Sequence, residues 1–462
     1  MNLNPMIGLE IHVQLMSQTK MYCRCSCSYS DPNTNCCPVC YGLPGALPVP
    51  NKYVFDLASR CAHLLKCSLN EFSVAERKNY FYPDLPKGYQ ISQFLKPIGE
   101  SGEWFFFSEG VECRARIRRI QVEEDTAQLI VKGQDSLLDF NRSGIPLLEI
   151  VTEPDFKNSR EAGEFLRSLR SSLIECEIST GKMETGAMRC EPNVSVSVDG
   201  RISNKVEIKN LGSISGVEKA IKWEIACQVK QVEDGEVVDS VTKGWDESSQ
   251  KCILQRVKES ASDYRYFPEP DLSMIKTRKS SFDVLTPYQK VKIMMDKGVS
   301  FQMARTISLN HKVFNYYQSF PKGINNKELA AWITGPLSSF WKNDSSILGI
   351  SPKVKDMTEL ICYVESGKVT RAIAKEILPK LIKGSDIDSL VSALGDSNYL
   401  SDQDLSVLAE DIVRQNPGIV EKYLNGKTAV IKSLVGMGMR KSKGRAHPEL
   451  LKLEIEKNIK LT

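Results

Sequence analysis

The segment Ile7–Leu15, IGLEIHVQL, decides the fold of the N-terminal half of this chain. Polar and apolar residues alternate along it: Leu9, Ile11 and Val13 on one side, and Glu10, His12 and Gln14 on the other. Successive side chains of a β-strand point to opposite faces of a sheet, so the alternation predicts a strand with one face on the core. The other face would carry a carboxylate and an imidazole. That pair could supply two ligands of a metal site, but taken alone it is more typical of an ordinary solvated face.

The neighbouring sequence predicts more strands and a helix that packs on them. An Asp199-Gly200 pair lies between alternating runs in residues 194–209, which is a strong hairpin signal, and Asp234-Gly235 suggests a second hairpin. Residues 113–122 alternate like a half-buried strand, and the apolar positions of residues 159–176 follow helical spacing. Residues 1–285 are therefore expected to form an α+β domain with a mixed or antiparallel sheet.

Strand-like alternation fades beyond residue 286, and helical patterns replace it. Helices are expected over residues 356–366 and 369–383 and from Asp402 onward, with a break near residues 396–402. The sequence thus predicts an all-α domain over residues 286–398 and a small helical tail over residues 399–462.

Composition excludes several classes of protein. Of the 462 residues, 41% are apolar and 26% charged, which is the balance of a soluble globular protein. No apolar run approaches the roughly 18 residues of a membrane span. The N-terminus shows neither a secretory signal nor an Arg-rich transit peptide, so we expect a cytoplasmic protein. The net charge is +4, but residues 417–462 alone carry ten Lys or Arg against four Asp or Glu. Such a basic tail suits phosphate contacts, and also suits a solvated helical face.

Six of the fourteen cysteines lie between residues 23 and 40. Four of them, Cys23, Cys25, Cys37 and Cys40, have the pairwise spacing of a tetrahedral zinc site, which is structural when all four ligands are thiolates. Cys27 and Cys36 are rival donors. An iron–sulfur cluster and unliganded thiols are the alternatives, and the spacing is atypical for the cluster.

Acidic residues offer a second metal site. Glu149 lies in the apolar run PLLEIVTEPD, where a carboxylate is costly to bury without a partner or an ion. Glu123, Glu124 and Asp125 form a further acidic stretch. Carboxylate oxygens suit Mg²⁺, and an added histidine leans toward Mn²⁺.

Aromatic residues are interleaved with charged ones in residues 78–84, KNYFYPD, and 263–271, DYRYFPEPD. Such segments can stack a base or adenine beside a phosphate, and can equally be packed loops. The chain has no G-x-x-x-x-G-K-[ST] motif, which excludes a P-loop, and no G-x-S-x-G or kinase signature.

Several long motifs together resemble one family. They are IGLEIHVQL, CPVCYGLPGALPVPN, RKNYFYPDLPKGYQISQ, VEEDTAQ, DFNRSGIPLLEIVTEPD and DYRYFPEPDL. These segments are similar to the B subunits of the tRNA-dependent amidotransferases (GatB of the GatCAB complex). The resemblance implies a glutamine synthetase-like cradle domain, a helical domain and a small YqeY-like tail.

The resemblance also implies a reaction and its partners. Such a protein uses ATP to phosphorylate the side-chain carboxylate of Glu on misacylated tRNA-Gln, and of Asp on tRNA-Asn in many complexes. Ammonia supplied by the A-type subunit, an amidase, then displaces the phosphate. The complex is a heterotrimer whose third member is the small C-type subunit. The alternative is a non-catalytic, zinc-containing scaffold that binds tRNA. The sequence does not choose between the two tRNAs.

Site residues carry over from the family by position. The metal ligands fall on Glu10, His12, Glu124 and Glu149, and the zinc ligands on Cys23, Cys25, Cys37 and Cys40. Residues expected around ATP and substrate are Lys78, Tyr80, Tyr82, Asp84, Lys87, Arg142 and Arg265. The two arginines would contact phosphate or carboxylate, or form structural salt bridges. In the tail, tRNA phosphates would meet Arg440, Lys441, Lys443 and Arg445.

Overall fold

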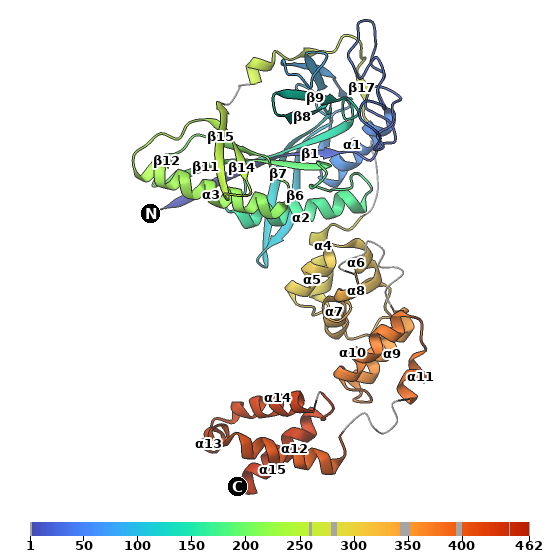
Figure 1. Ribbon diagram of the computed structural model, residues 1–462, viewed down its shortest axis with the longest axis vertical. Coiled ribbons are helices and arrows are strands. Elements are labelled where there is room, and N and C mark those ends of the chain that lie inside the picture. Colours follow the sequence, from blue (N-terminus) through green and yellow to red (C-terminus); the bar gives the residue numbers. More distant parts are fainter. Residues whose placement is uncertain are drawn as a thin grey trace. The chain divides into compact units, whose positions relative to one another are not determined.

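Two compact units make up the chain, residues 1–290 and residues 291–462. The computed structural model describes residues 2–257, 261–278, 284–341, 352–393, 400–442 and 444–461. Each unit is described separately below (Figure 1).

A ten-stranded sheet dominates the first unit, with the predicted first strand, β1 (Leu3–Gln14), near its middle. β1 pairs antiparallel with β10 (Pro146–Thr152) and with β11 (Met188–Val198). Beyond β10 come β7 (Val111–Glu124), β6 (Gly99–Ser108) and β2 (Ser68–Leu69). Beyond β11 come β13 (Val206–Lys209), β14 (Val241–Asp246) and β15 (Lys251–Val257). Of the described pairs in this sheet only β13 and β14 run parallel, so the sheet is mixed but mostly antiparallel.

One of the two predicted hairpins is confirmed. Asp199 and Gly200 both have positive φ, 47° and 86°, and join β11 to its antiparallel partner β12 (Arg201–Ile202). The prediction of a second hairpin at Asp234-Gly235 is wrong. The run before it belongs to α3 (Ile214–Glu233), Asp234 caps that helix, and Gly235 has φ +80°. A glycine in the left-handed region ends helices as readily as it turns hairpins, so the dipeptide alone was ambiguous.

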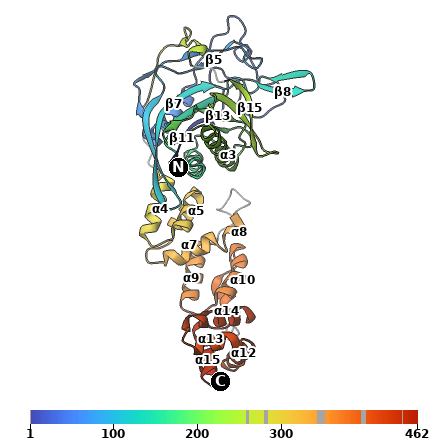
Figure 2. The same ribbon diagram turned by 90° about the vertical axis from the view of Figure 1, so that its left-hand side faces the viewer.

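Three helices cover one face of the large sheet: α1 (Lys52–Leu64), α2 (Ser159–Glu175) and α3. α2 confirms the predicted helix. Its apolar stripe is fully buried, and the Asn158 side chain accepts a hydrogen bond from the Glu161 amide to cap its N-terminus. Figures 1 and 2 show α2 and α3 lying together along this face. The apolar side of β1 packs into the same core.

Short sheets complete the first unit. β4 (Glu76–Asn79) pairs with β5 (Tyr89–Ser92) and with β16 (Phe267–Pro268). β3 (Phe72–Ser73) pairs with β17 (Ile275–Lys276), and β8 (Gln128–Lys132) forms a hairpin with β9 (Asp135–Asp139). One 3₁₀ turn spans Ala261–Tyr264. The polar face of β1 is left to line a cavity between these elements.

The described part of the second unit is helical throughout. After α4 (Pro287–Asp296), which crosses the division, the helices are α5 (Phe301–Ser308), α6 (His311–Gln318), α7 (Asn326–Thr334), α8 (Ser338–Trp341), α9 (Val354–Glu365), α10 (Arg371–Ile382), α11 (Ile387–Ser392), α12 (Asp402–Gln415), α13 (Pro417–Leu424), α14 (Ile431–Lys441) and α15 (Pro448–Leu461). α9, α10 and α12 confirm the three predicted helices. The proposed boundary at residues 398–399 lies outside the described residues, so it stays a prediction.

The last helices share a hydrophobic core of their own, to which α12, α14 and α15 all contribute. Leu434 and Leu451 are fully buried within it. None of the helices in the described ranges has the length and apolar character that a bilayer crossing requires.

Candidate active site and four-cysteine cluster

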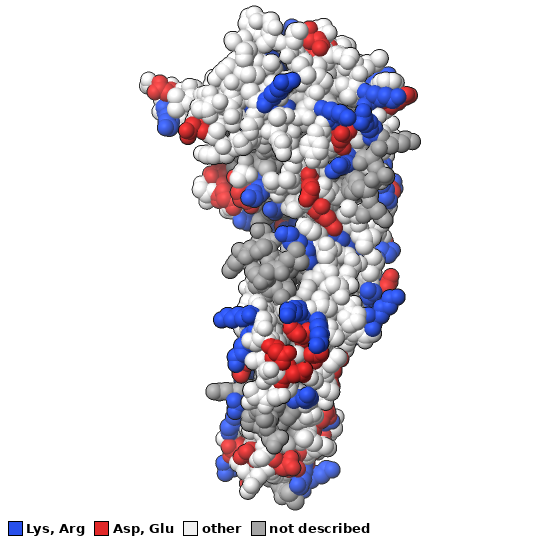
Figure 3. Space-filling view, turned by 90° about the vertical axis from the view of Figure 1, so that its right-hand side faces the viewer, with Lys and Arg blue, Asp and Glu red and all other residues white. Residues whose placement is uncertain are grey.

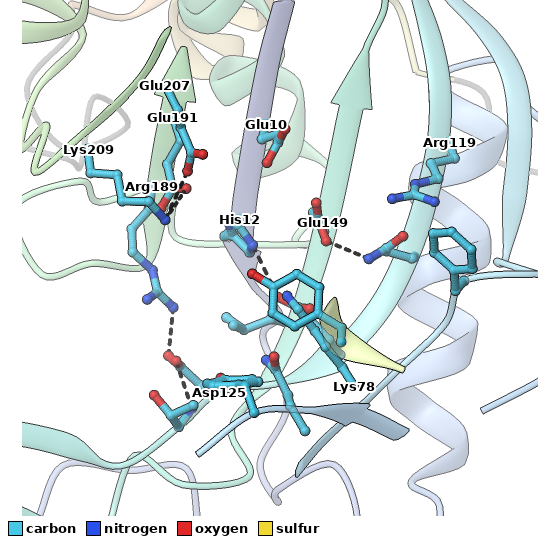
Figure 4. A pocket seen from close by; sticks show the side chains of 18 of the residues that line it. Glu10, His12, Lys78, Arg119, Asp125, Glu149, Arg189, Glu191, Glu207 and Lys209 are labelled. Carbon is cyan, nitrogen blue, oxygen red and sulfur yellow. Dashed lines mark hydrogen bonds and ion pairs between the residues drawn. The ribbon is translucent and has the colours of Figure 1, made fainter. Parts of the chain in front are cut away.

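A cavity of about 390 Å³ opens on the sheet face opposite the helices (Figure 4). Its walls are rich in charge. The ionisable residues that line it are Glu10, His12, Lys78, Tyr80, Arg119, Glu123, Asp125, Glu149, Arg189, Glu191, Lys205, Glu207, Lys209, Tyr264 and Tyr266. Most come from adjacent strands of the large sheet, so the strand register sets the arrangement.

A column of polar side chains crosses the sheet at the centre of this cavity. His12 lies opposite Glu149, and Glu149 lies opposite Gln121 on the next strand. The Gln121 amide donates a hydrogen bond of 2.5 Å to the Glu149 carboxylate. His12 Nε2 lies 3.1 Å from a carboxylate oxygen of Glu123. Ligand atoms of His12, Glu123 and Glu149 all lie within 4.8 Å of one another, close enough to share one cation.

The three groups perturb one another strongly. Burial disfavours a charged imidazole, but the hydrogen bond and charge of Glu123, with the charge of Glu149, raise the pKa of His12 to about 9. Burial would raise the pKa of Glu123, yet its bond to His12 and the charge of Lys78 lower it to about 2. Burial, then the Glu123 charge, raises the pKa of Glu149 to about 7. Such divergence is typical of functional sites.

Glu124, expected among the metal ligands, is not brought to this cluster. It points to the opposite side of β7, where its carboxylate pairs with the Lys87 ammonium and accepts a hydrogen bond of 3.0 Å from the Ile91 amide. Glu123 takes its place. Alternation contained this signal, because Val122 faces the core and its neighbour Glu123 must face away from it.

Three more of the expected residues line the cavity. Glu10 accepts a hydrogen bond of 3.0 Å from the Asn193 side chain. Tyr80 packs edge-on against Tyr264, with ring centroids 6.0 Å apart. The Lys78 ammonium lies 5.0 Å from the centre of the Tyr264 ring. Burial alone would lower the pKa of Lys78, but Glu123, Tyr266 and Glu149 raise it, so the lysine is a cation inside the cavity.

The remaining expected residues do not line this cavity. Tyr82 is 57% exposed on a separate hollow, and Asp84 accepts a hydrogen bond of 2.9 Å from the Thr126 hydroxyl. Lys87 is engaged by Glu124, as described above. Arg142 donates to the carbonyls of Thr126 and Ala127 at 3.0 and 2.6 Å, which is a structural role. Arg265 is exposed, with φ +43°.

Two arginines that the sequence reasoning missed do line the cavity. Arg189 donates to Asp125 at 2.7 Å. Arg119 has no carboxylate partner within the described residues; its guanidinium lies 5.3 Å from the Phe94 ring, and its buried Nε has no hydrogen-bond partner there. Figure 4 shows Glu10, His12 and Glu149 between Arg119 on one side and Arg189 with Lys209 on the other. A period-2 count carried forward from Ala115 and Ile117, which face the core, misses Arg119, because the pairing of β7 with β10 shifts opposite Arg118. A count carried back from Glu123 would have placed it on the cavity face.

Four cysteines converge in the loops that follow β1. Ligand sulfurs of Cys23, Cys25, Cys37 and Cys40 all lie within 4.8 Å of one another. Sγ of Cys40 is 3.7 Å from that of Cys23 and 3.8 Å from that of Cys37. Four convergent thiols fit a tetrahedral zinc ion, which would fill the centre of this cluster and hold loops that have little core of their own. The expected four-cysteine site is thus consistent with zinc.

The two rival cysteines lie outside this group. The Cys36 thiol faces the Asn141 side-chain oxygen at 3.5 Å. Cys27 is held through its backbone amide, which donates to the Gln18 carbonyl at 3.0 Å. Burial raises the pKa of the Cys27 thiol to about 11. Neither residue is needed to complete a tetrahedral set.

The basic tail presents its charges at the end of α14. Arg440, Lys441 and Arg445 are exposed, whereas Lys443 lies outside the described residues. Lys441 pairs with Asp411 of α12 at 2.9 Å. Figure 3 shows Lys and Arg interspersed with Asp and Glu over the face that it draws, without a single continuous basic patch. Arg440 and Arg445 are therefore the better candidates for phosphate contacts.

Family models first define the class of protein. A model described as the GatB/GatE catalytic domain matches residues 5–283, which contain the sheet, the cavity and the cysteine cluster. A second, described as the GatB domain, matches residues 315–459, which lie in the helical unit.

Individual relatives narrow the class. The curated B subunit of the aspartyl/glutamyl-tRNA(Asn/Gln) amidotransferase of Pseudothermotoga lettingae is 38% identical to this chain, with 98% of each chain covered. The Thermotoga maritima protein of the same name is 39% identical, with 99% of each chain covered. The Acaryochloris marina protein is 37% identical, covering 98% of this chain and 97% of its own. The chain belongs to the GatB family of aspartyl/glutamyl-tRNA(Asn/Gln) amidotransferase B subunits.

Proposed function

We propose that this chain phosphorylates the side-chain carboxylate of Glu on misacylated tRNA-Gln, or of Asp on tRNA-Asn, and then amidates it with ammonia. The observation that carries the proposal is one cavity that combines a potential cation site with cationic side chains that no described carboxylate pairs. A scaffold that only bound tRNA would have no reason to bury His12, Glu123 and Glu149 together.

Phosphoryl transfer requires charge neutralisation and positioning more than covalent chemistry from the protein. His12, Glu123 and Glu149, with Glu10 beside them, are the residues that would hold Mg²⁺ or Mn²⁺. Such an ion would supply charge compensation for the oxygens of ATP. The carboxylate-rich donor set fits a hard cation, and one imidazole does not exclude it.

Lys78 and Arg119 would bind the phosphates. Each lines the cavity without a carboxylate ion pair among the described residues, whereas Arg189 is paired with Asp125 and Lys209 with Glu191. A cation already matched to a fixed acid has less to offer an incoming anion. Arg119 can also present its guanidinium as a two-pronged donor, which matches phosphate geometry.

The reaction has two steps, phosphoryl transfer to the carboxylate and then displacement of phosphate by ammonia. An oxygen of the aminoacyl carboxylate attacks the γ-phosphorus, the bond to the β–γ bridging oxygen breaks, and ADP leaves with that electron pair. Ammonia then attacks the carbonyl carbon of the acyl phosphate. The carbon–oxygen bond to phosphate breaks, inorganic phosphate departs and takes up the proton that nitrogen releases, and the amide remains. Phosphate is a competent leaving group where hydroxide is not.

Other parts of the chain fit roles around this chemistry. The sheet domain would be the glutamine synthetase-like cradle, and the four-cysteine loops a structural zinc knuckle. The helical unit and its YqeY-like tail would position tRNA through phosphate contacts that do not read sequence. Ammonia would come from the A-type amidase partner, and the small C-type partner would complete the heterotrimer.

Glu149→Ala tests the proposal in the reconstituted complex. We expect ATP cleavage that depends on misacylated tRNA to fall to background, while the complex still assembles and still hydrolyses glutamine. The matched control is Glu153→Ala, since Glu153 lies just beyond the same strand and pairs with Arg118 outside this cavity. Full ATP cleavage by Glu149→Ala would remove the catalytic assignment and leave the scaffold as the better account.

A further inference from the structure

Lys20 is a fully buried lysine with an unusual set of neighbours. Its relative exposure is 0%, and its ammonium lies 3.3 Å from Sγ of Cys40 and 3.1 Å from the carbonyl oxygen of Phe140. The neighbouring Gly144, with φ +81°, places its backbone against the aliphatic stem of Lys20; a Cβ there would lie 3.6 Å from the lysine Cδ. The side chain is thus enclosed along its length.

No carboxylate pairs with this ammonium among the described residues. Burying an isolated ammonium is costly unless an anion lies beside it. The Phe140 carbonyl is neutral and offers only part of that compensation. Of the two groups that accept its hydrogen bonds, Cys40 is the one that can carry a full negative charge, in its thiolate form. The burial of Lys20 therefore favours negative charge in the four-cysteine cluster.

Zinc binding supplies that charge. Four thiolates around Zn²⁺ leave a formal charge of −2 on the centre, because each thiol must lose its proton to ligate the ion. One adjacent ammonium reduces the net charge of the assembly to −1. We infer that Lys20 is a positioning residue of the zinc site: its ammonium donates a hydrogen bond to the Cys40 thiolate and stabilises the metal-loaded cluster.

The same lysine joins the cluster to the sheet. Phe140, which accepts its second hydrogen bond, lies in the segment between β9 and β10. The Ser143 hydroxyl of that segment donates to the Cys40 carbonyl at 3.1 Å, and the Met21 amide donates to the Gly144 carbonyl at 2.8 Å. β10, which begins at Pro146, carries Glu149 into the active-site cavity. These hydrogen bonds link the cysteine cluster to the segment that leads into that strand.

Zinc affinity measured by chelator competition on the full-length protein tests this role. Removing a hydrogen-bond partner of a metal ligand typically costs about 10–100-fold in affinity. We expect that loss for Lys20→Met, and a smaller one for Lys20→Gln, which keeps an N–H donor without the charge. The matched control Lys66→Met removes an exposed ammonium that pairs with Glu103, and should leave zinc affinity unchanged.

Cobalt substitution separates an effect on the thiolate from a general loss of structure. The sulfur-to-cobalt charge-transfer band should move to lower energy in both Lys20 variants, because a thiolate becomes a better electron donor when it loses the adjacent positive charge, and the shift should be larger in Lys20→Met, which also loses the hydrogen bond. If Lys20→Met does not fold, Lys20→Gln still provides both measurements. Unchanged zinc affinity with an unchanged band in a folded variant would overturn the inference, as would a wild-type protein that binds no zinc. The readouts are independent of catalysis, so their failure would leave the proposed reaction untouched.

Discussion

His12 Nε2 lies 3.1 Å from the carboxylate of Glu123, whereas the next residue in the chain, Glu124, faces the other side of the strand and pairs with Lys87. The adjacent residues Glu123 and Glu124 thus have different partners on opposite faces of β7. Glu123 belongs to the charged cluster of the cavity, and Glu124 compensates the charge of Lys87, whose side chain is only 14% exposed. The distinction yields a direct test.

Glu123→Gln should abolish ATP cleavage that depends on misacylated tRNA without unfolding the protein, because it removes a charged ligand but keeps the shape. Glu124→Gln should act mainly on stability, with a loss of about 3 kcal/mol, since breaking a buried ion pair leaves the Lys87 charge uncompensated. Calorimetric melting and ATP hydrolysis, measured side by side on both variants, give the comparison. The reverse pattern would assign Glu124 to the site.

Arg119→Met should raise the KM for ATP by about 10–100-fold, the value of one or two charge-assisted hydrogen bonds. Arg119→Lys should recover part of the loss, because it keeps the charge but not the planar fork. Steady-state ATP titrations of the complex measure both. Arg114→Met on the same strand is the control, because Arg114 is 55% exposed and pairs with Glu103. Equal KM values in all variants would remove Arg119 from the phosphate site.

Asp155 should contribute stability that depends on pH. Its carboxylate accepts hydrogen bonds from the Arg116 backbone at 2.9 Å and from the Arg116 guanidinium. Burial alone would raise the pKa of Asp155, but the contacts with Arg116 outweigh burial and lower this pKa overall. A depressed folded-state pKa gives stability that is present above the unfolded-state pKa, about 3.9, and lost as pH falls through the folded value.

Asp155→Asn should therefore unfold at a lower urea concentration than wild type at pH 7, and the difference should shrink toward pH 3. Urea denaturation at a series of pH values measures this trend. Asp239→Asn, at an exposed position, should follow the wild-type curve throughout. A difference for Asp155→Asn that stayed constant with pH would exclude the ionic origin of the effect.

Two glycines of α14 should respond oppositely to alanine. A Cβ at Gly438 would lie 2.6 Å from a methyl of Leu451 and 2.7 Å from one of Ile412, so the helices approach closely there. Gly438→Ala should destabilise the tail by about 1–3 kcal/mol through overpacking. A Cβ at Gly436 would have no neighbouring heavy atom within 4 Å, so Gly436→Ala should stabilise the helix by up to about 1 kcal/mol. Thermal melts of the full chain, followed by circular dichroism, measure both effects. If both variants changed the melting temperature in the same direction, the close packing at Gly438 would be contradicted.

Arg440→Gln combined with Arg445→Gln should flatten the dependence of tRNA affinity on salt. Each lost phosphate contact reduces the slope of log K against log salt by somewhat less than one. Filter binding at several salt concentrations gives the slope, and phosphorylation of the aminoacyl carboxylate on tRNA that is already bound should persist. Lys457→Gln with Lys460→Gln removes the same charge from α15 as a control. An unchanged slope in the first pair would show that the tail does not meet phosphates there.

Local patterns in the sequence predicted much of this architecture. Alternation in Ile7–Leu15 identified the central strand, helical spacing identified α2, and Asp199-Gly200 identified a hairpin. The cysteine spacing suggested the four sulfurs that converge, although it left Cys27 and Cys36 as rival donors. These features depend on residues close together in the chain, where backbone geometry alone limits the outcome.

The residues that line the candidate site were harder to predict because their arrangement depends on contacts between distant strands. The register of β1, β10 and β7 places His12, Glu149 and Gln121 in one row, and the shift opposite Arg118 turns Arg119 toward the cavity. Arg142 and Arg265 carry the charge expected of phosphate ligands, but backbone carbonyls engage one and the other stays exposed.

By itself, the sequence determined the strands and helices whose periodicity is unambiguous, the faces that they bury and the chemical groups that the chain has available. Alternation along β7 put Glu123 and Glu124 on opposite faces, but only the tertiary structure brought the Glu123 face to His12 and enclosed Lys20 beside Cys40. The physical reason is that a charged side chain acquires its function from its neighbours in space. Strand pairing and burial choose those neighbours, and no local pattern records that choice.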